Sequence, residues 1–262
     1  MTQPFWKMHG AGNDFILIDD RALAFPSTHA AHIRHLCDRR RGIGSDGLIL
    51  LQPPAAPPAH FRMRFYNPDG AEADLCGNGA RCVARFAHEL GIAPADMLIQ
   101  TAAGPLRAEW LGHQARLHMP PPRDWQLHQT IPWRGQPQTI HAVNTGVPHA
   151  VWFTPDLPSL DLPAWGAHLR HHPHFAPAGA NANAVQITGP SALAIRTYER
   201  GVEAETLACG TGITAAALIA AQLGHVTPPV HVTTAGNDTL QVTLHPLTLT
   251  GPAQISFRGT LP

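Results

Sequence analysis

Two stretches of the chain have the pattern of a helix that ends at a glycine. Residues 80–90 and 213–223 contain no proline and no internal glycine, and they are followed by Gly91 and Gly224. Glycine is the usual left-handed stop of a helix. The second stretch is apolar on nearly all sides, which predicts a central helix enclosed by a sheet.

Short apolar or alternating runs predict strands in two series, and a proline run at 119–123 separates the series. Two further helices are predicted at 28–38 and 162–171. The predicted strands are 14–18, 47–51, 61–66, 97–101, 106–110 and 115–119, then 140–144, 150–153, 184–187, 192–198, 230–234, 239–244 and 253–258.

The same short phrase opens both glycine-stopped helices. CGNG occupies residues 76–79 and CGTG occupies residues 209–212, and in both copies the cysteine precedes the stop glycine by 15 residues. The copies are 133 residues apart in a chain of 262. The sequence therefore predicts two related halves, each with one thiol at the start of a helix.

The position of Cys76 and Cys209 suits acid–base chemistry. Backbone N–H groups and the positive end of the helix dipole stabilise anions at a helix N-terminus, and they lower a thiol pKa from about 8.5 toward neutrality. A single cysteine of this kind is equally typical of a buried structural residue. Its recurrence in register favours two thiols that face each other across a cleft and move protons.

The remaining cysteines and the single lysine argue against a metal or a pyridoxal cofactor. No C-x-x-C pair exists, so zinc-ribbon and thioredoxin spacings are absent, and Cys37 and Cys82 are expected to be buried, inert thiols. Lys7, the one lysine, lies near the start of a first strand, where it is poorly placed to form a Schiff base. We therefore expect no cofactor and no metal.

Composition excludes several classes of partner. Hydrophobic residues make up 44% of the chain and charged residues 14%, with a formal net charge of zero. No basic surface is therefore expected for nucleic acid or an anionic membrane. The first ten residues lack the apolar segment of a signal peptide, and no apolar run approaches the roughly 18 residues that span a bilayer. We expect a soluble, cytoplasmic protein.

Polar residues precede each cysteine at similar distances. YNPDG at 66–70 lies ahead of the first cysteine, and YERG at 198–201 lies ahead of the second. Each begins with a tyrosine at a strand end and continues toward the helix, which places Asn67, Glu199 and Arg200 on the cleft side.

Two more glycine-containing turns, GAGND at 10–14 and NTGVPH at 144–149, stand at matching offsets in the two halves. His149 is one of 18 histidines and would more often be structural, but its place in this second turn favours a site residue. GIGSDG at 42–47 lacks the Gly-Lys-Ser/Thr of a phosphate loop, so nucleotide binding is not expected.

In this order, the motifs resemble the diaminopimelate epimerase family of cofactor-independent amino-acid epimerases. The resemblance covers nearly the whole chain. It rests on KMHGAGNDF at 7–15, GIGSDG at 42–47, YNPDG at 66–70, LCGNGAR at 75–81, NTGVPH at 144–149, GANANAVQ at 179–186 and YERGVEAETLACGTG at 198–212.

The resemblance implies an α/β (α+β) fold of two pseudo-symmetric domains, each a mixed sheet wrapped around a central helix, with the active site in the cleft between them. The expected domains are 1–122, with Cys76, and 123–250, with Cys209. The final strand, 251–262, is expected to return to the first domain.

The resemblance also assigns roles to particular residues. It implies that Cys76 and Cys209 form the acid–base pair, and that Glu199 and His149 line the site near the reacting centre. The implied substrate-binding groups are the side chains of Asn13, Asn67, Asn181, Glu199 and Arg200, the last gripping the distal carboxylate, and the backbone N–H groups of Gly77, Asn78, Gly210 and Thr211.

The implied activity is the interconversion of LL- and meso-diaminopimelate in lysine and cell-wall biosynthesis, by a homodimer with a small amino acid as its substrate. Some members have Gln where this chain has Gly47, and Asn where it has Val147. Two alternatives therefore stay open. One is a related two-cysteine racemase or epimerase for proline, hydroxyproline or histidine, and the other is a non-catalytic binding module.

Overall fold

The structure of the protein is a computed structural model that describes residues 3–261, and it divides into two compact units. The first unit comprises the chain up to His118 and the chain from Gly251 onward, and the second comprises Met119–Thr250. Across residues 3–261, none of the helices combines the length and apolar character needed to span a membrane.

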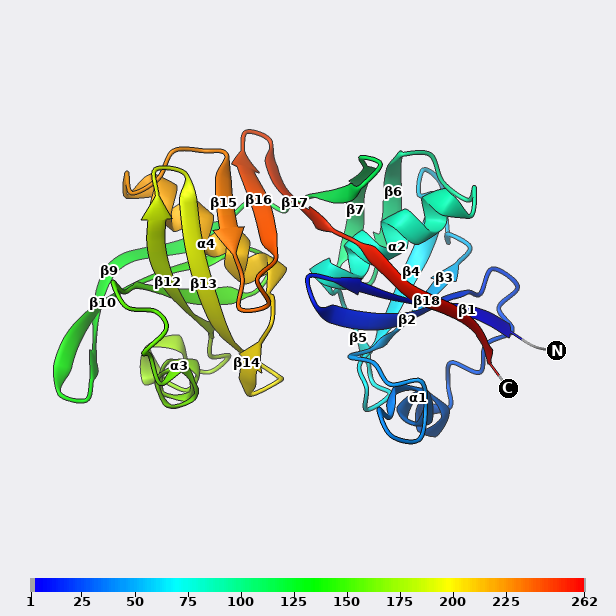
Figure 1. Ribbon diagram of the computed structural model, residues 1–262, viewed down its shortest axis with the longest axis horizontal. Helices are drawn as coiled ribbons and strands as arrows, with labels where there is room; N and C mark the ends of the chain where they lie inside the picture. The colour runs from blue at the N-terminus through cyan, green and yellow to red at the C-terminus, as the bar shows by residue number, and fades with distance from the viewer. Residues whose placement is uncertain (1–2, 262) are drawn as a thin grey trace. The chain divides into compact units, whose positions relative to one another are not determined.

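The first unit contains helices α1 (Ala30–Cys37) and α2 (Gly77–Glu89) and one mixed sheet (Figure 1). Its strands are β1 (Gln3–Gly10), β2 (Asn13–Asp19), β3 (Leu48–Gln52), β4 (Phe61–Tyr66), β5 (Glu72–Ala73), β6 (Asp96–Thr101), β7 (Gly104–Trp110), β8 (Gln114–His118) and β18 (Gln254–Leu261).

The second unit contains helices α3 (Leu162–Arg170) and α4 (Gly210–Gln222), a 3-10 turn (Pro173–Phe175) and a second mixed sheet. Its strands are β9 (Arg123–Trp133), β10 (Gln136–Asn144), β11 (Pro148–Phe153), β12 (Asn181–Gly189), β13 (Ala192–Glu199), β14 (Ala204–Thr206), β15 (Val230–Thr233), β16 (Thr239–Leu244) and β17 (Leu247–Pro252), the last of which crosses the boundary between the units.

The two sheets have the same order of pairings. In the first unit, β18, β1, β2, β3, β4, β6, β7 and β8 are successive neighbours. In the second unit, β9, β10, β11, β12, β13, β15, β16 and β17 are successive neighbours. In both, only the third and fifth pairings are parallel, and a helix connects the strands of each parallel pair. This match confirms the predicted fold class of two pseudo-symmetric halves.

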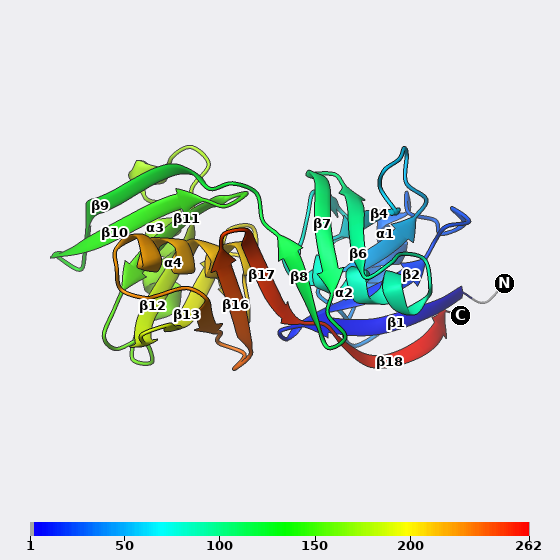
Figure 2. The ribbon, with the colours of Figure 1, turned by 90° about the horizontal axis from the view of Figure 1, so that it is seen from above.

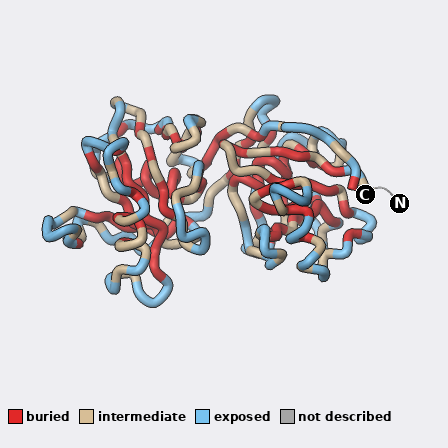
Figure 3. Tube along the Cα trace, turned by 60° about the horizontal axis from the view of Figure 1, so that its bottom comes forward, coloured by how far each residue is buried: buried red, intermediate tan, exposed pale blue. Residues whose placement is uncertain are grey.

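Each sheet wraps around the helix that follows a CGxG phrase. In the first unit α2 contacts β1, β2, β3, β4, β7 and β8, and in the second α4 contacts β10, β11, β12, β13, β15 and β16 (Figures 1 and 2). Residues 212–220 of α4 are buried without interruption, which confirms the predicted enclosed helix. In Figure 3 the buried stretches run through the interior of each unit, and exposed segments lie around them.

Both central helices end as their sequences predict. Gly91 and Gly224 have φ values of +68° and +73°, in the left-handed region that favours glycine. The N–H of each glycine and that of the next residue donate to carbonyls of the last turn, over 3.0 and 2.9 Å in α2 and over 3.0 and 2.8 Å in α4. This pair of bonds is the Schellman motif, which satisfies carbonyls that the helix itself leaves unpaired.

A second helix covers the opposite face of each sheet. In the first unit Ile33 and Leu36 of α1 belong to a buried cluster that includes residues of β1, β2, β3 and β4. In the second unit Leu162, Trp165 and Leu169 of α3 pack in a buried cluster with residues of β10 to β13. The four helices predicted from the sequence are thus all present, within three residues of their predicted limits.

Candidate functional site

The two repeated cysteines occupy equivalent backbone positions in the two units. Cys76 (φ −128°, ψ 117°) and Cys209 (φ −118°, ψ 107°) are the extended N-cap residues of α2 and α4. Their carbonyls accept the first helical bonds, from Ala80 N–H at 2.8 Å and Ile213 N–H at 2.9 Å. Cys76 is half-buried and Cys209 is buried. The predicted placement of both thiols at helix starts is confirmed.

The helix starts also bring the candidate carboxylate-binding amides into position. Gly77, Asn78, Gly210 and Thr211 lie in the first turns of α2 and α4, where N–H groups have no acceptor further back in the helix. The first turn of a helix favours the binding of an anion, because its free N–H groups and the positive end of the helix dipole both face the anion. At Gly212 a Cβ would lie 2.4 Å from Asn183 Oδ1, so only glycine lets α4 begin this close to the sheet.

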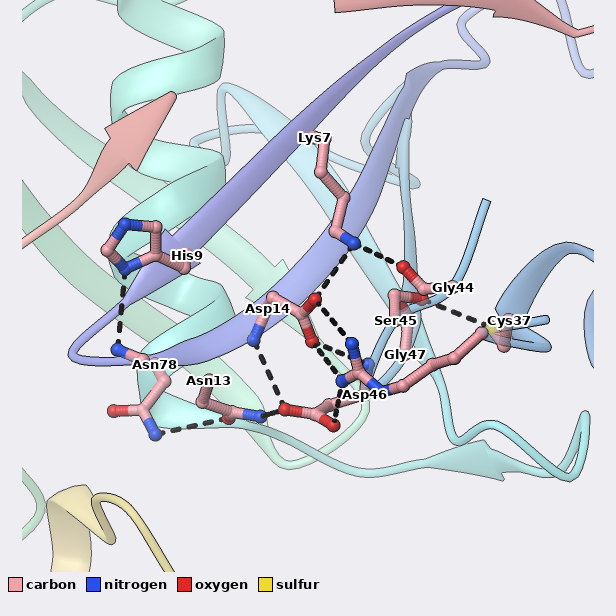
Figure 4. A network of polar contacts seen from close by, with 12 residues as sticks. Lys7, His9, Asn13, Asp14, Cys37, Gly44, Ser45, Asp46, Gly47 and Asn78 are labelled. Carbon is pink, nitrogen blue, oxygen red and sulfur yellow. Dashed lines mark hydrogen bonds and ion pairs between the residues drawn. The ribbon is translucent and has the colours of Figure 1, made fainter. Parts of the chain in front are cut away.

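In the first unit Asn13 contacts the Cys76 thiol. A chain of hydrogen bonds holds Asn13 in place (Figure 4). Asn13 Nδ2 donates to Asp46 Oδ2 at 2.8 Å, and Asn13 Oδ1 accepts from Asn78 Nδ2 at 3.1 Å and lies 3.6 Å from Cys76 Sγ. Asn78 Oδ1 in turn accepts from the fully buried Arg81 at 2.8 Å. Three candidate residues, Asn13, Cys76 and Asn78, therefore meet in one cluster.

Charged groups support this cluster through Asp14 and Asp46. Arg39 Nη2 donates to both Asp14 Oδ1 and Asp46 Oδ1 at 2.7 Å, and Lys7 Nζ lies 2.8 Å from Asp14 Oδ2. Lys7 also donates to the Gly44 carbonyl (Figure 4). Burial raises the pKa of Asp14, but hydrogen bonds and charges from Arg39 and Lys7 outweigh it and bring this pKa down to about 2.

The structure does not join Asn67 to this cluster by any hydrogen bond described within residues 3–261. Asn67 lies in the turn between β4 and β5, and its backbone N–H donates to Ala71 O at 2.9 Å.

Gly47 has no room for a side chain, because a Cβ there would lie 2.5 Å from Phe65 Cε2 and 2.7 Å from Tyr66 O.

In the second unit the polar candidates share one face of the sheet. His149 on β11 lies opposite Asn181 on β12, and Asn183 on β12 lies opposite Thr197 on β13. Glu199 follows Thr197 two residues further along β13. Alternate residues of a strand point to the same side, so all five side chains lie on one face. That face is the one covered by α4, since Asn183 and His149 approach the start of α4 while intervening residues of β12 and β13 pack on α3.

Glu199 and Cys209 each have a threonine neighbour. Glu199 Oε2 accepts from Thr206 Oγ1 at 2.8 Å; burial raises the pKa of Glu199, and this hydrogen bond partly opposes the rise. Cys209 Sγ lies 3.5 Å from Thr211 Oγ1. Thr145 Oγ1 donates to the Thr211 carbonyl at 2.9 Å and ties the start of α4 to the turn that precedes β11.

Asn181 and Arg200 form one structural pair. Asn181 Oδ1 accepts from the backbone N–H of Arg200 at 2.7 Å, and its Nδ2 donates to Pro148 O at 3.4 Å. The Arg200 guanidinium donates to Ala178 O at 3.3 Å. Burial, and secondly the charge of Arg200, lower the pKa of the wholly buried His149 to about 3, so its imidazole is neutral at ordinary pH.

The sequence did not identify several residues that organise these clusters. Lys7, Asp46 and Asn183 stand inside the motifs noted above, but the motifs alone give them no partners. The strand alternation that places Asn183 beside His149 is the one signal that identifies any of them.

Cys37 and Cys82 are buried, as predicted, and burial raises the pKa of both thiols, that of Cys82 to about 12. Within residues 3–261 no group of three or more His, Cys, Asp or Glu side chains could hold a metal ion.

Comparison with known proteins decides the family. The diaminopimelate epimerase family model matches residues 5–123 and 141–255. The chain belongs to the diaminopimelate epimerase family. Its members are isomerases that act as amino-acid epimerases, and the recognition from motifs is confirmed.

Relatives in this family match almost the entire chain. The diaminopimelate epimerase of Chlorobaculum tepidum is 45% identical over 97% of this chain and 99% of the relative. That of Gluconobacter oxydans is 42% identical over 99% of both chains, and that of Aquifex aeolicus is 38% identical over 98% of this chain and 97% of the relative.

Solved structures of low sequence identity share the fold. A probable proline racemase from Agrobacterium radiobacter superposes with a TM-score of 0.74 at 18% identity, over 99% of this chain and 93% of that one. A phenazine biosynthesis protein of the PhzF family from Bacillus anthracis gives a TM-score of 0.73 at 15% identity, over 100% and 99%. The fold of the family therefore extends to proteins whose sequences differ greatly from this one.

Proposed function

We propose that this protein interconverts LL- and meso-diaminopimelate with Cys76 and Cys209 as its two bases. The observation that carries the proposal is the equivalence of the two cysteines. Each is an extended N-cap residue that follows a short strand, β5 or β14, and the two units have the same strand order. A structural role explains neither the repetition nor the glycines after each thiol. Membership in an epimerase family agrees with it.

Inversion of an α-carbon needs two groups, because a proton leaves one face and another arrives on the opposite face. In the proposed reaction a thiolate of one cysteine accepts the α-proton while the thiol of the other delivers its own. The reverse reaction exchanges these roles. The mechanism requires both units to present their cysteines to the same substrate molecule.

The α-proton of an amino acid is weakly acidic, so the charge that develops when it leaves needs stabilisation. We assign this to the first-turn amides of α2 and α4, at Gly77, Asn78, Gly210 and Thr211, as donors to the reacting carboxylate. Fixed donors that face a developing charge cost no reorganisation during the reaction. Glu199 and His149 are assigned positions beside the reacting centre; His149 is fully buried and Glu199 is half-buried.

The second charged end of the substrate would be bound by Arg200, with Asn13, Asn67 and Asn181 as further contacts. A guanidinium matches a carboxylate through two parallel hydrogen bonds. Asn181 supports this role for Arg200, because its 2.7 Å bond fixes the backbone from which the guanidinium extends.

One observation favours the related racemase as a second candidate. Gly47 takes the place of a glutamine found in some members, and the ring of Phe65 and the carbonyl of Tyr66 fill the space where that side chain would begin. Val147, half-buried in the turn before β11, also lacks an amide. A pocket without these amides suits a substrate with fewer polar groups, such as proline, hydroxyproline or histidine.

We further propose that the two units act as half-repeats of a single active protein that works as a homodimer in the cytoplasm. A reducing compartment keeps thiols unoxidised, which the two-thiol mechanism requires. Light scattering of the purified protein gives the mass and therefore tests the dimer.

Solvent-deuterium exchange tests the function. The enzyme is incubated in D₂O with LL-diaminopimelate, meso-diaminopimelate, proline, hydroxyproline and histidine, and incorporation at the α-carbon is followed by NMR. Exchange and epimerisation of diaminopimelate alone are expected. Exchange of one of the other three instead identifies the related racemase, and no exchange with any of the five amino acids supports a binding module.

A further inference from the structure

One ring nitrogen of His149 faces the side-chain amide of Asn183. Both residues are fully buried, and Asn183 Nδ2 lies 3.2 Å from His149 Nδ1. A neutral imidazole has one N–H donor and one acceptor nitrogen, and the partner of one nitrogen decides which is which. The direction of the Asn183 amide therefore decides where the His149 proton resides.

Three neighbours fix the direction of that amide. Asn183 Nδ2 lies 2.9 Å from Ala150 O and 3.3 Å from Asn181 O, which can only accept hydrogen bonds. Asn183 Oδ1 accepts from Thr197 Oγ1 at 3.0 Å. A reversed amide would place its oxygen against two carbonyl oxygens, so the nitrogen faces His149.

An amide nitrogen donates and does not accept, since its lone pair is delocalised into the carbonyl. A proton on His149 Nδ1 would therefore meet the hydrogens of Asn183 and find no acceptor. The imidazole is neutral because burial lowers its pKa to about 3, so its single proton resides on Nε2. Nε2 is buried, and no partner for it is described within residues 3–261.

We propose that Asn183 is a positioning residue that holds His149 as the Nε2–H tautomer and thereby keeps one buried N–H donor for an anionic oxygen of the bound amino acid. This proposal rests on the proposed function for the identity of the ligand, whereas the tautomer follows from the protein alone. A buried N–H donor without a partner destabilises the free protein, and an acceptor atom of a bound ligand would recover that free energy. His149 then stabilises negative charge as a donor and is not the base that accepts the α-proton.

The first test is a ¹⁵N NMR measurement on the free protein labelled at histidine, with His149→Gln to assign the signals. Protonated and unprotonated ring nitrogens of a neutral imidazole have well-separated shifts. We expect Nδ1 of His149 at the unprotonated shift and Nε2 at the protonated shift throughout pH 6–9. A proton on Nδ1, an averaged pair of shifts, or a titration within this range would overturn the proposal.

The second test changes the direction of the bond. When its carboxylate is ionised, Asn183→Asp presents only acceptor atoms. It should then place a proton on Nδ1 of His149, which the ¹⁵N shifts report, and reduce kcat for diaminopimelate by tenfold or more, with a smaller change in KM. Gln138→Ala is the matched control, since it removes a side-chain amide bonded at 2.9 Å to Trp165 in the same unit. It should leave both kinetic constants and the His149 shifts unchanged.

The outcomes are distinguishable. If Asn183→Asp does not fold, the wild-type spectrum still decides the tautomer. A wild-type protein with the expected shifts and no activity on any amino acid contradicts the proposed function but not the role of Asn183. Full kcat in a folded Asn183→Asp variant whose proton has moved to Nδ1 would show that the Nε2–H donor has no part in the reaction.

Discussion

Asn13 donates its side-chain N–H to Asp46 Oδ2 over 2.8 Å, and this bond turns the Asn13 carbonyl oxygen toward the Cys76 thiol. The opposite end of the same chain of bonds is Arg81, which acts through the Asn78 amide. The Asp46 carboxylate can only accept and the Arg81 guanidinium can only donate. The side-chain amides of Asn13 and Asn78, which lie between them, therefore have one favourable orientation each. Asn13 therefore presents its acceptor oxygen to the thiol.

Asp46→Asn should leave the orientation of the Asn13 amide less well fixed, because an uncharged amide at position 46 can face Asn13 with either its oxygen or its nitrogen. Hydrogen bonds to charged groups contribute about 1.5–3 kcal/mol, so we expect kcat/KM to fall by roughly 10- to 100-fold. The fall in kcat/KM is measured by steady-state kinetics of diaminopimelate epimerisation. The matched control is Asp19→Asn, which removes an Arg21-paired carboxylate at the end of the strand that begins with Asn13, and it should retain wild-type rates. Equal rates in both variants would contradict the orienting role.

The two cysteines at the helix starts should be essential, and the other two should not. Cys76→Ala and Cys209→Ala should each abolish epimerisation, whereas Cys37→Ala and Cys82→Ala should retain most of it per folded molecule. The measurement is α-proton exchange in D₂O, with circular dichroism as the check on folding. Near-normal turnover in either of the first two variants would refute the two-thiol mechanism.

Much of the fold could be predicted because its signals are local. The Leu-Gly ends of α2 and α4 and the apolar surface of α4 lie within single segments, and the structure shows both helices. Strand β9 was missed. Its eleven residues, Arg123–Trp133, are mostly exposed or half-buried, so they lack the alternation by which strands are recognised. Only its pairing with β10 makes it a strand.

The site could be predicted in part for the same reason. Repetition within the sequence identified Cys76 and Cys209. The partners of the site residues depend on register between distant segments, as when Asp46 meets Asn13 across 33 residues or Asn183 meets His149 across 34. No periodicity within one segment contains that information.

The ion pairs of Asp14 should make stability depend on acid pH. Its pKa in the folded protein, about 2, lies below the value of 3.8 for an unfolded chain. The charged form therefore stabilises the fold above pH 3.8, and this contribution is lost as the pH falls toward 2. The difference corresponds to about 2 kcal/mol. Asp14→Asn should lower the free energy of unfolding by at least that amount at pH 7 and by much less at pH 2, as measured by urea titration.

Gly47→Ala should destabilise the protein, because the added Cβ would lie 2.7 Å from the backbone oxygen of Tyr66 as well as 2.5 Å from the Phe65 ring. Overpacking of this kind costs about 1–3 kcal/mol. Phe65→Leu should relieve only part of the loss, since the Tyr66 carbonyl cannot move with the ring. Full recovery in the double variant, measured by thermal unfolding, would show that the ring alone excludes a side chain.

Arg200→Lys tests what the protein accepts as its substrate. If Arg200 grips the distal carboxylate of diaminopimelate, a lysine cannot reproduce the two parallel bonds, and a desolvated pair cut on one side costs roughly 2–5 kcal/mol. We expect kcat/KM for diaminopimelate to fall by at least tenfold, mostly through KM, while iodoacetamide still alkylates Cys76 and Cys209 at wild-type rates. Arg170→Lys is a matched control, because Arg170 also donates to the Ala178 carbonyl, at 3.4 Å. If Arg200→Lys keeps wild-type efficiency on diaminopimelate, this arginine holds no distal carboxylate, and the related racemase becomes the better account of the pocket.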